Sequence, residues 1–317
     1  MIRGRLAPSP TGALHLGNAR TFLLAWLSVR EQGGRVVLRV EDLDGPRVKS
    51  GAAAAAIDDL RWMGLDWDEG PDCGGPHAPY IQTERAARYN DEIERLRVQR
   101  LIYPCVCSRS DIFGAASAPH PGEEGPRYPG TCRGRFDSAD AARTVAGRDP
   151  ALRFVVPAGP VDFDDQSLGR LSIDVAAQVG DFVVRKGNGT AAYQLAVAVD
   201  DAAMQITEVV RGDDLIASTP RQILLYRALG QAPPAFRHVP LVVGRDGLRL
   251  AKRHGDTRIA SFRRRGVRPE RFVGVLAQWC GLKPAGAECM PPDLVRGFDW
   301  NGVPSERIVC VGDNVLD

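Results

Sequence analysis

The sequence predicts an α/β protein with a parallel sheet, and three stretches carry that prediction. Residues 3–24 begin with a short apolar run, pass through a loop rich in Pro and Gly, and continue with apolar residues at helical spacing. Residues 35–39 add a β-branched run after that helix, so strand, helix and strand form a βαβ unit. The apolar runs 197–199 and 206–210 are typical of strands buried on both faces of a parallel sheet.

Composition places the chain among ordinary globular proteins. The 317 residues are 44% hydrophobic and 25% charged, which suffices for a large core and for two or three domains. We expect no membrane segment, because no apolar run approaches the roughly 20 residues that a bilayer requires. Arg3 and Arg5 precede Pro, Ser and Thr instead of an apolar stretch, so we expect no signal peptide and a cytoplasmic protein.

The first loop has the features of a phosphate-binding junction. Backbone N–H groups at the start of a helix are unpaired and lie at the positive end of its dipole, where they favour an anion. Gly12 and Gly17 allow close approach of a ligand, and His15 would place a ring N–H within reach of a polyphosphate. These residues alone do not distinguish such a site from an ordinary strand–loop–helix junction.

The next elements follow from local pattern. Glu41 ends the second strand, and a parallel sheet binds its ligands at the carboxyl ends of its strands, although a solvated turn would suit the same residue. Residues 52–63 are rich in Ala and form a helix that Gly64 ends. Residues 83–101 form an amphipathic helix.

Three cysteines in the middle of the chain have spacing that suits zinc. Cys105 and Cys107 form a Cys-x-Cys pair, and Cys132 follows after a segment rich in Gly, Pro, Ala and Ser. Structural zinc takes four tetrahedral ligands, and either His120 or Tyr128 could supply the fourth. Buried cysteines without a metal are the alternative interpretation. The short antiparallel strands expected within residues 151–175 complete a small insertion with this segment.

The second half adds further candidates. Tyr193 and Arg211 are expected at strand ends that face the crevice, and a guanidinium fork suits a carboxylate. In isolation the Arg-Gly-Asp-Asp sequence at 211–214 favours a turn with a surface ion pair. The net charge is only +2, yet residues 245–271 hold ten Arg or Lys against three acids. This basic segment is either a footprint for a phosphate backbone or a solvated helix face.

Several motifs resemble those of one enzyme family. Residues 8–18, Pro-Ser-Pro-Thr-Gly-x-Leu-His-Leu-Gly-Asn, resemble the nucleotide-binding signature of class I aminoacyl-tRNA synthetases in its glutamyl/glutaminyl form. The resemblance covers residues 5 to about 300 and rests on four blocks: 5–18, 39–44, 190–222 and 249–254. Within this class the chain is most similar to the glutamyl-queuosine tRNA(Asp) synthetases. That family carries Cys-x-Cys followed by Tyr-x-x-x-Cys, and its members lack the long anticodon-binding domain of glutamyl-tRNA synthetases.

The resemblance implies a domain plan. It gives a Rossmann-like catalytic domain in two halves, residues 1–100 and 186–245, separated by a zinc-containing insertion at 101–185. Residues 246–317 would contain a mobile Lys loop and a helical stem-contact-like segment, and no anticodon-binding domain is expected.

The resemblance also implies a reaction. Glutamate is activated by ATP and Mg²⁺ without tRNA, and is then transferred to queuosine at the wobble position of tRNA(Asp), whose anticodon arm docks near the active site. We expect a monomer. The alternatives are a truncated glutamyl-tRNA synthetase that charges the acceptor end of tRNA(Glu), and a catalytically weak tRNA-binding paralogue.

The implied site residues fall into three groups according to the ligand they would bind. Glutamate would be bound by Arg5, Leu6, Ala7, Pro8, Ser9, Glu41, Tyr193 and Arg211. ATP would be bound by Thr11, Gly12, His15, Gly17, Asn18 and Lys252, of which Lys252 and His15 are the catalytic pair. Zinc would be bound by Cys105, Cys107, Tyr128 and Cys132.

Lys252 belongs to a variant of the second class I signature. The chain has only four lysines among 41 Lys and Arg residues, and one of them falls where the signature has its Lys. Arg249 replaces the usual leading Lys, and Ala251 replaces Ser, which removes a hydroxyl that could bond the nucleotide. These departures leave the catalytic rate open.

Overall fold

The computed structural model describes residues 1–108, 110–112, 126–248, 250, 256–310 and 312. Within these ranges no helix has both the length and the apolar character that crossing a membrane requires. The amino-terminal elements are β1 (Arg3–Leu6), α1 (Leu16–Glu31), β2 (Arg35–Leu38), η1 (Gly45–Arg47), α2 (Ala52–Trp62), η2 (Gln82–Arg85) and α3 (Ala86–Val98).

A parallel arrangement of strands forms the centre of the molecule, as the sequence predicts. β1 pairs with β2 in parallel, with Arg3 opposite Arg35. On its other side β1 lies beside β8 (Glu208–Gly212), and the Thr207 N–H donates to the Arg3 carbonyl at 2.9 Å. β8 pairs in parallel with β9 (Ala235–Val239). The carboxyl ends of β1, β2 and β8 therefore open toward one edge.

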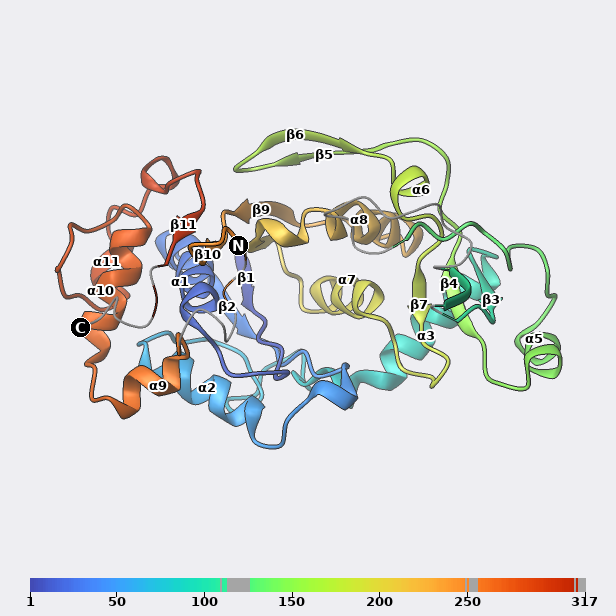
Figure 1. The fold of residues 1–317 in the computed structure, drawn as a ribbon, viewed down its shortest axis with the longest axis horizontal. Helices are drawn as coiled ribbons and strands as arrows, with labels where there is room; N and C mark the ends of the chain where they lie inside the picture. The colour runs from blue at the N-terminus through green and yellow to red at the C-terminus, as the bar shows by residue number, and fades with distance from the viewer. Residues whose placement is uncertain (109, 113–125, 249, 251–255, 311, 313–317) are drawn as a thin grey trace.

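α1 joins the central strands to the carboxyl-terminal helices. Its buried face contributes Leu23, Leu24 and Leu27 to the larger apolar core. Phe272 and Leu276 of α10 belong to the same core, so this helix packs directly on α1 (Figure 1). The carboxyl-terminal elements are β10 (Val242–Val243), α9 (Ile259–Arg264), α10 (Pro269–Trp279), α11 (Pro292–Val295), η5 (Trp300–Gly302) and β11 (Ile308–Val309).

The prediction of a strand at 197–199 is wrong, because these residues lie in helix α7 (Tyr193–Ala203). Eight successive residues of α7, from Gln194 to Asp201, are buried. A helix buried on all sides has the same continuous apolar run as a strand in a parallel sheet, so periodicity does not separate them. Tyr193 consequently lies at the start of a helix, while Arg211 lies in β8 as expected.

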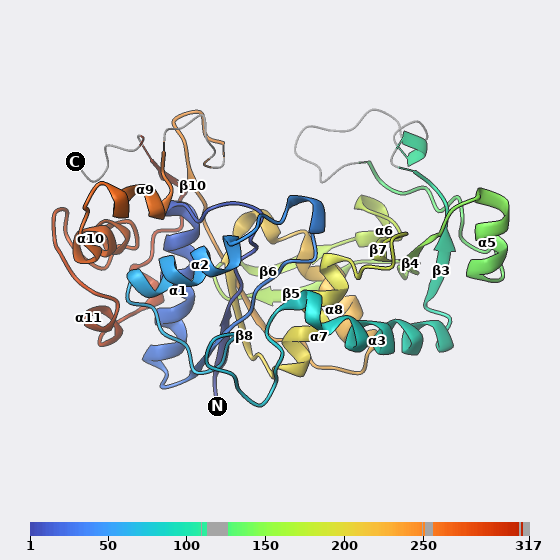
Figure 2. The ribbon, with the colours of Figure 1, turned by 90° about the horizontal axis from the view of Figure 1, so that it is seen from below.

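The middle of the chain forms two small antiparallel units (Figure 2). β4 (Ala151–Phe154) lies between β3 (Ile102–Cys105) and β7 (Val183–Arg185), and α5 (Ala139–Ala146) lies beside them. β5 (Val161–Asp165) and β6 (Gly169–Ile173) form a hairpin, followed by α6 (Val175–Gln178). β5 also pairs with β9, so this hairpin extends the sheet of β8. η3 (Asp213–Leu215) and α8 (Ser218–Ala228) connect β8 to β9.

Candidate active site

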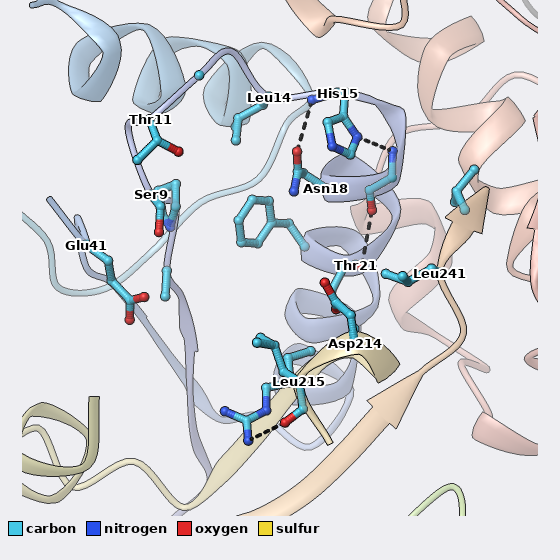
Figure 3. Close-up of a pocket in the computed structure, with 18 of the residues that line it drawn as sticks. Ser9, Thr11, Leu14, His15, Asn18, Thr21, Glu41, Asp214, Leu215 and Leu241 are labelled. Carbon is cyan, nitrogen blue, oxygen red and sulfur yellow. Dashed lines mark hydrogen bonds between the residues drawn. The ribbon is translucent and has the colours of Figure 1, made fainter. Parts of the chain in front are cut away.

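A cavity of about 480 Å³ lies at the carboxyl ends of the central strands. Figure 3 shows Glu41 and Leu215 toward one end of it, and His15 and Asn18 toward the other. The cavity is lined by all but one of the predicted glutamate- and ATP-binding residues that the structure describes: Arg5, Ala7, Pro8, Ser9, Thr11, Gly12, His15, Gly17, Asn18, Glu41, Tyr193 and Arg211. The exception is Leu6, whose side chain is 0% exposed in the core.

The helix start at one end of the cavity is built as an N-cap around His15. Its Nδ1 accepts from the Gly17 N–H at 3.1 Å, and its own N–H donates to Asn18 Oδ1 at 3.2 Å. Because Nδ1 accepts a hydrogen bond, the hydrogen of a neutral ring is on Nε2. The predicted strand–loop–helix junction is therefore present, and the His15 imidazole is fixed by the backbone of the helix.

The Lys loop cannot be placed, because Lys252, Arg249 and Ala251 lie outside the described residues. The chain that follows it can. The Leu16 N–H donates to the Thr257 carbonyl at 3.0 Å, and the Ile259 N–H donates to the Leu14 carbonyl at 2.9 Å. A second cavity of about 980 Å³ lies here and shares residues 11–15 with the first.

Arg211 enters the cavity from β8 with its guanidinium held at several points. Nη1 donates to Gln222 Oε1 at 2.8 Å, and Nη2 donates to Thr219 Oγ1 at 2.7 Å and to the Leu215 carbonyl at 3.4 Å. Burial lowers the pKa of Arg211, and the charge of Arg5 adds to that shift. Two buried arginines side by side favour the binding of an anion.

Glu41 is part of a buried network of charges. Its Oε1 accepts from Arg39 Nη2 at 2.8 Å, and Arg39 Nη1 donates to Asp201 Oδ1 at 2.6 Å. Burial raises the pKa of Glu41, and Arg39 opposes that shift. Burial alone would lower the pKa of Arg39, but Asp201, Glu41 and Asp200 hold it well above its usual value. The network fixes the Glu41 carboxylate at the cavity wall.

Tyr193 lies at the mouth of the cavity and remains 37% exposed. Burial of the phenol against the cavity walls raises its pKa, and the negative charge of Glu41 adds to that shift. Its hydroxyl is therefore neutral at pH 7 and can donate a hydrogen bond.

Sequence reasoning missed the residues that hold these groups in place. Arg39 and Asp201 fix Glu41, while Thr219, Gln222 and His238 fix Arg211. One signal was available: the acidic pair Asp200–Asp201 interrupts an apolar run, and buried acids require partners. For His238 the local sequence offers no comparable signal.

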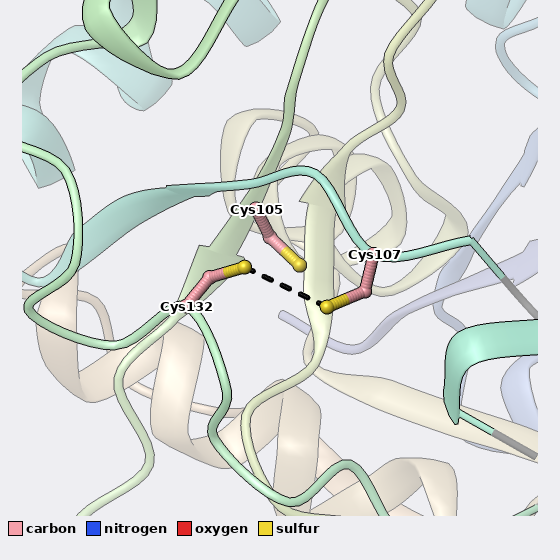
Figure 4. Close-up of side chains that lie close together, drawn as sticks. All are labelled: Cys105, Cys107 and Cys132. Atoms are coloured by element: carbon pink, nitrogen blue, oxygen red, sulfur yellow. Dashed lines mark hydrogen bonds between the residues drawn. The ribbon is translucent and has the colours of Figure 1, made fainter. Parts of the chain in front are cut away.

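The three predicted cysteine ligands converge beside the sheet of β3, β4 and β7 (Figure 4). The sulfur atoms of Cys105, Cys107 and Cys132 lie within 4.8 Å of one another, and those of Cys107 and Cys132 are 3.6 Å apart. The Tyr128 hydroxyl is 3.4 Å from the Cys105 sulfur and 4.0 Å from that of Cys107. Sulfur atoms about 2.3 Å from a tetrahedral zinc are about 3.8 Å apart, so the thiols fit a metal. His120 lies outside the described residues.

A cation would also stabilise this cluster electrostatically. Burial and the neighbouring thiols raise the pKa of Cys107 to about 12. Arg153 donates to the Cys105 sulfur from Nε at 3.2 Å and lies over the Tyr128 ring. Three thiolates together at neutral pH require more positive charge than one arginine supplies.

Comparison with known proteins identifies relatives over nearly the whole chain. Residues 1–312 match the family described as tRNA synthetases class I (E and Q), catalytic domain. The Glutamyl-Q tRNA(Asp) synthetase of Symbiobacterium thermophilum is 52% identical over 309 residues, which cover 97% of this chain and 95% of that protein. The protein of the same name from Nitratidesulfovibrio vulgaris is 46% identical, with coverage of 100% and 98%.

Glutamate–tRNA ligases are similar as well, but over part of their length. Glutamate–tRNA ligase 1 of Halorhodospira halophila is 46% identical over 94% of this chain and 62% of its own length. The crystal structure of a glutamate tRNA ligase from Elizabethkingia meningosepticum, in complex with its amino acid, superposes with a TM-score of 0.82 at 27% identity. That match covers 99% of this chain and 68% of the ligase.

Proposed function

Because the chain belongs to the class I tRNA synthetases for glutamate and glutamine, we propose that it is a ligase that attaches glutamate to queuosine in tRNA(Asp). The observation that carries this proposal is the 52% identity to a Glutamyl-Q tRNA(Asp) synthetase, covering 97% of this chain and 95% of that protein. The reaction has two steps, which are activation of glutamate by ATP and transfer to the wobble nucleotide.

The cavity has charges that complement glutamate. We assign Arg211 to the side-chain carboxylate and Glu41 to the α-ammonium group, with Tyr193 as a hydrogen-bond donor at the mouth. Arg5 lies where it can bind the second carboxylate, since its side chain lines the same cavity. The backbone of residues 6–9 completes this half of the site, although the side chain of Leu6 packs in the core.

The helix start has the chemistry required for ATP phosphates. Thr11, Gly12, Gly17 and Asn18 line the cavity beside His15, whose ring hydrogen on Nε2 can bond a phosphate oxygen. Mg²⁺ accompanies ATP in this class of enzyme and neutralises part of the polyphosphate charge. Lys252 is assigned to stabilise the negative charge that develops on the α-phosphate.

Catalysis in this arrangement is positioning and charge stabilisation. An oxygen of the α-carboxylate attacks the α-phosphorus of ATP, and pyrophosphate leaves. A hydroxyl of the queuosine cyclopentenediol then attacks the carbonyl carbon, loses its proton and displaces AMP, which leaves an ester. No side chain needs to act as a covalent nucleophile.

We further propose that Cys105, Cys107, Cys132 and Tyr128 bind one structural zinc ion. The support is the approach of three thiols and one phenol within a buried cluster. Zinc in such a site stabilises the local fold and takes no part in the reaction. The division into catalytic halves at 1–100 and 186–245, an insertion at 101–185 and a helical segment at 246–317 is part of the same proposal, as is a cytoplasmic monomer.

Two measurements test the two steps. Glutamate-dependent exchange between pyrophosphate and ATP is expected without tRNA, and Lys252→Ala is expected to abolish it. Absence of exchange in the wild type would favour a catalytically weak, tRNA-binding paralogue.

Charging of tRNA(Asp) tests the second step. Glutamate is expected on tRNA(Asp) that contains queuosine and not on the same tRNA that carries guanosine at the wobble position. Equal charging of both, or charging of tRNA(Glu), would favour a glutamate–tRNA ligase, the class to which the Halorhodospira halophila relative belongs.

A further inference from the structure

His238 contacts the guanidinium of Arg211 on the side away from the ligand cavity. The two residues are partners in the register of the parallel strands β8 and β9. Arg211 Nε lies 3.1 Å from His238 Nε2, and the Thr219 hydroxyl lies 3.1 Å from the same nitrogen. His238 is 0% exposed and does not line the cavity, so its contact with the site passes through Arg211.

The hydrogen bonds fix the tautomer of His238. An arginine can only donate, so Nε2 must accept and the ring hydrogen must be on Nδ1. Nδ1 lies 2.6 Å from Asp165 Oδ2, which is the acceptor that this tautomer needs. Asp165 thus specifies which ring nitrogen is presented to Arg211.

Asp165 is itself held in one orientation. Its Oδ1 accepts from the Ser167 N–H at 2.9 Å and from the Leu168 N–H at 3.0 Å, in the turn of the β5–β6 hairpin. The His238 N–H also donates to Oδ2 at 3.2 Å. An amide at this position would direct its oxygen to the turn and its NH₂ group to the imidazole.

Electrostatics favour a neutral ring between these two charges. Burial lowers the pKa of His238, and Asp165 opposes that shift while Arg211 adds to it. Burial alone would raise the pKa of Asp165, but hydrogen bonds from His238 and the turn hold it below its usual value. Asp165, His238 and Arg211 therefore form a hydrogen-bonded row of a carboxylate, a neutral imidazole and a guanidinium.

We propose that Asp165 and His238 are positioning residues that orient Arg211 for the side-chain carboxylate of glutamate. Asp165 fixes the tautomer of His238, and His238 in turn fixes the plane of the guanidinium fork. This inference rests on the proposed function, since it needs Arg211 to bind glutamate. It gives the β5–β6 hairpin, which lies outside the cavity, a part in substrate recognition.

Two substitutions at one position separate orientation of Arg211 from general stability. His238→Gln places an amide oxygen near the position of Nε2 and can still accept from Arg211. His238→Asn keeps an amide near the position of Nδ1 but has no atom near the position of Nε2 to accept from Arg211. His238→Asn is expected to raise the KM for glutamate in pyrophosphate exchange about tenfold or more, the range of a charge-assisted hydrogen bond, with the KM for ATP unchanged. His238→Gln is expected to stay within about threefold of wild type.

Asp165→Asn tests the tautomer directly. Nitrogen NMR of labelled histidine is expected to show hydrogen on Nδ1 of His238 in the wild type and on Nε2 in this variant. The KM for glutamate should rise as in His238→Asn. Asp181→Asn is the matched control, because Asp181 is also a buried carboxylate that accepts from a backbone N–H, at Val156, without contacting Arg211.

The outcomes distinguish this inference from the proposed function. An unchanged glutamate KM in both His238→Asn and Asp165→Asn, with exchange intact, overturns the positioning role alone. Hydrogen on Nε2 or a charged ring in the wild type at neutral pH also overturns it, and this measurement requires no variant to fold. Absence of glutamate-dependent exchange in the wild type would count against the proposed function, while the NMR result would still test the row from Asp165 to Arg211.

Discussion

The charge state of the Glu41 carboxylate, at the cavity wall, depends on its surroundings. Burial raises its pKa above the usual value, so on acidification it is neutralised at a higher pH than an exposed glutamate. A neutral Glu41 cannot balance the α-ammonium group. We therefore expect the KM for glutamate to be constant at neutral pH and to rise on acidification, at a higher pH than the titration of an exposed glutamate would give.

The measurement is the KM for glutamate as a function of pH in pyrophosphate exchange. Glu41→Gln should have a higher KM throughout and no acidic rise. Glu69→Gln, a buried acid paired with Arg3 outside the cavity, should keep the rise of the wild type. A wild-type KM that is flat across this range would show that Glu41 does not bind the ammonium group.

Single residues were predictable where they belong to a motif of the family that the chain resembles. His15, Glu41 and Arg211 were ambiguous from their neighbours alone and were assigned through that resemblance, and all three line the cavity. The side chains that hold Glu41 and Arg211 in place could not be assigned, because their contacts join residues that are far apart in the sequence. Arg39 and Asp201 are 162 positions apart, and Asp165 and His238 are 73 apart.

At the scale of elements, the main error concerned α7. Its apolar residues are continuous because the helix is buried between an apolar core that includes Leu195, Ile223 and Phe236 and the charged network around Arg39. A short continuous run contains no periodicity from which to tell helix from strand. By contrast, the alternation of buried and exposed residues in β5 is a clear local signal of a strand.

From the cluster of Cys105, Cys107 and Cys132 we expect one bound zinc per chain. Cys132→Ser is expected to lose zinc by elemental analysis and to lower the Tm by on the order of 5 °C, since the metal ties β3 to the segment around residue 132. Cys73→Ser is the control, because Cys73 is exposed and outside the cluster.

Elemental analysis of two further variants distinguishes Tyr128 from His120 as the fourth ligand. Tyr128→Phe is expected to weaken zinc binding, whereas His120→Ala should leave it unchanged. Full zinc retention in Cys132→Ser would contradict the site altogether.

The basic helix α9 predicts an effect on tRNA binding alone. Arg263 pairs with Asp59 at 2.7 Å and lies over Trp62, so it has a structural role. Arg264, the last residue of α9, and Arg265, which follows it and lies over the Phe262 ring, are both exposed. Reversal of both to Glu should weaken tRNA binding and reduce its dependence on salt, while exchange stays unchanged.

Reversal of both Arg88 and Arg97 to Glu, on the exposed face of α3, changes the net charge by the same amount and is the control. The measurement is the Kd for tRNA over a range of salt concentrations. If the double reversal at α9 left both the Kd and its salt dependence unchanged, this helix would be excluded from the tRNA surface.

On the scale of the whole molecule, the cavity lies between elements that are far apart in the sequence. β1, β2 and β8 supply its walls, the β3–β4–β7 unit lies toward one end of the molecule, and α10 and α11 lie toward the other (Figures 1 and 2). The parallel arrangement was predictable because βαβ connections restrict topology strongly. The pairing of the β5–β6 hairpin with β9 was not, since an isolated hairpin pattern does not indicate which edge it joins.

The nucleotide that receives glutamate depends on the whole molecule and not on the cavity alone. A cavity for ATP and glutamate suits both a glutamyl-queuosine enzyme and a glutamate–tRNA ligase, so its geometry does not choose between them. The choice rests on the similarity to Glutamyl-Q tRNA(Asp) synthetases over nearly all of both chains.

The position of glutamate on charged tRNA tests this choice most directly. tRNA(Asp) containing queuosine would be charged with labelled glutamate, cleaved on both sides of the anticodon loop, and its fragments separated before and after mild base. We expect base-labile label in the anticodon fragment, on the queuosine nucleotide. Label on the terminal adenosine of the acceptor end would contradict it.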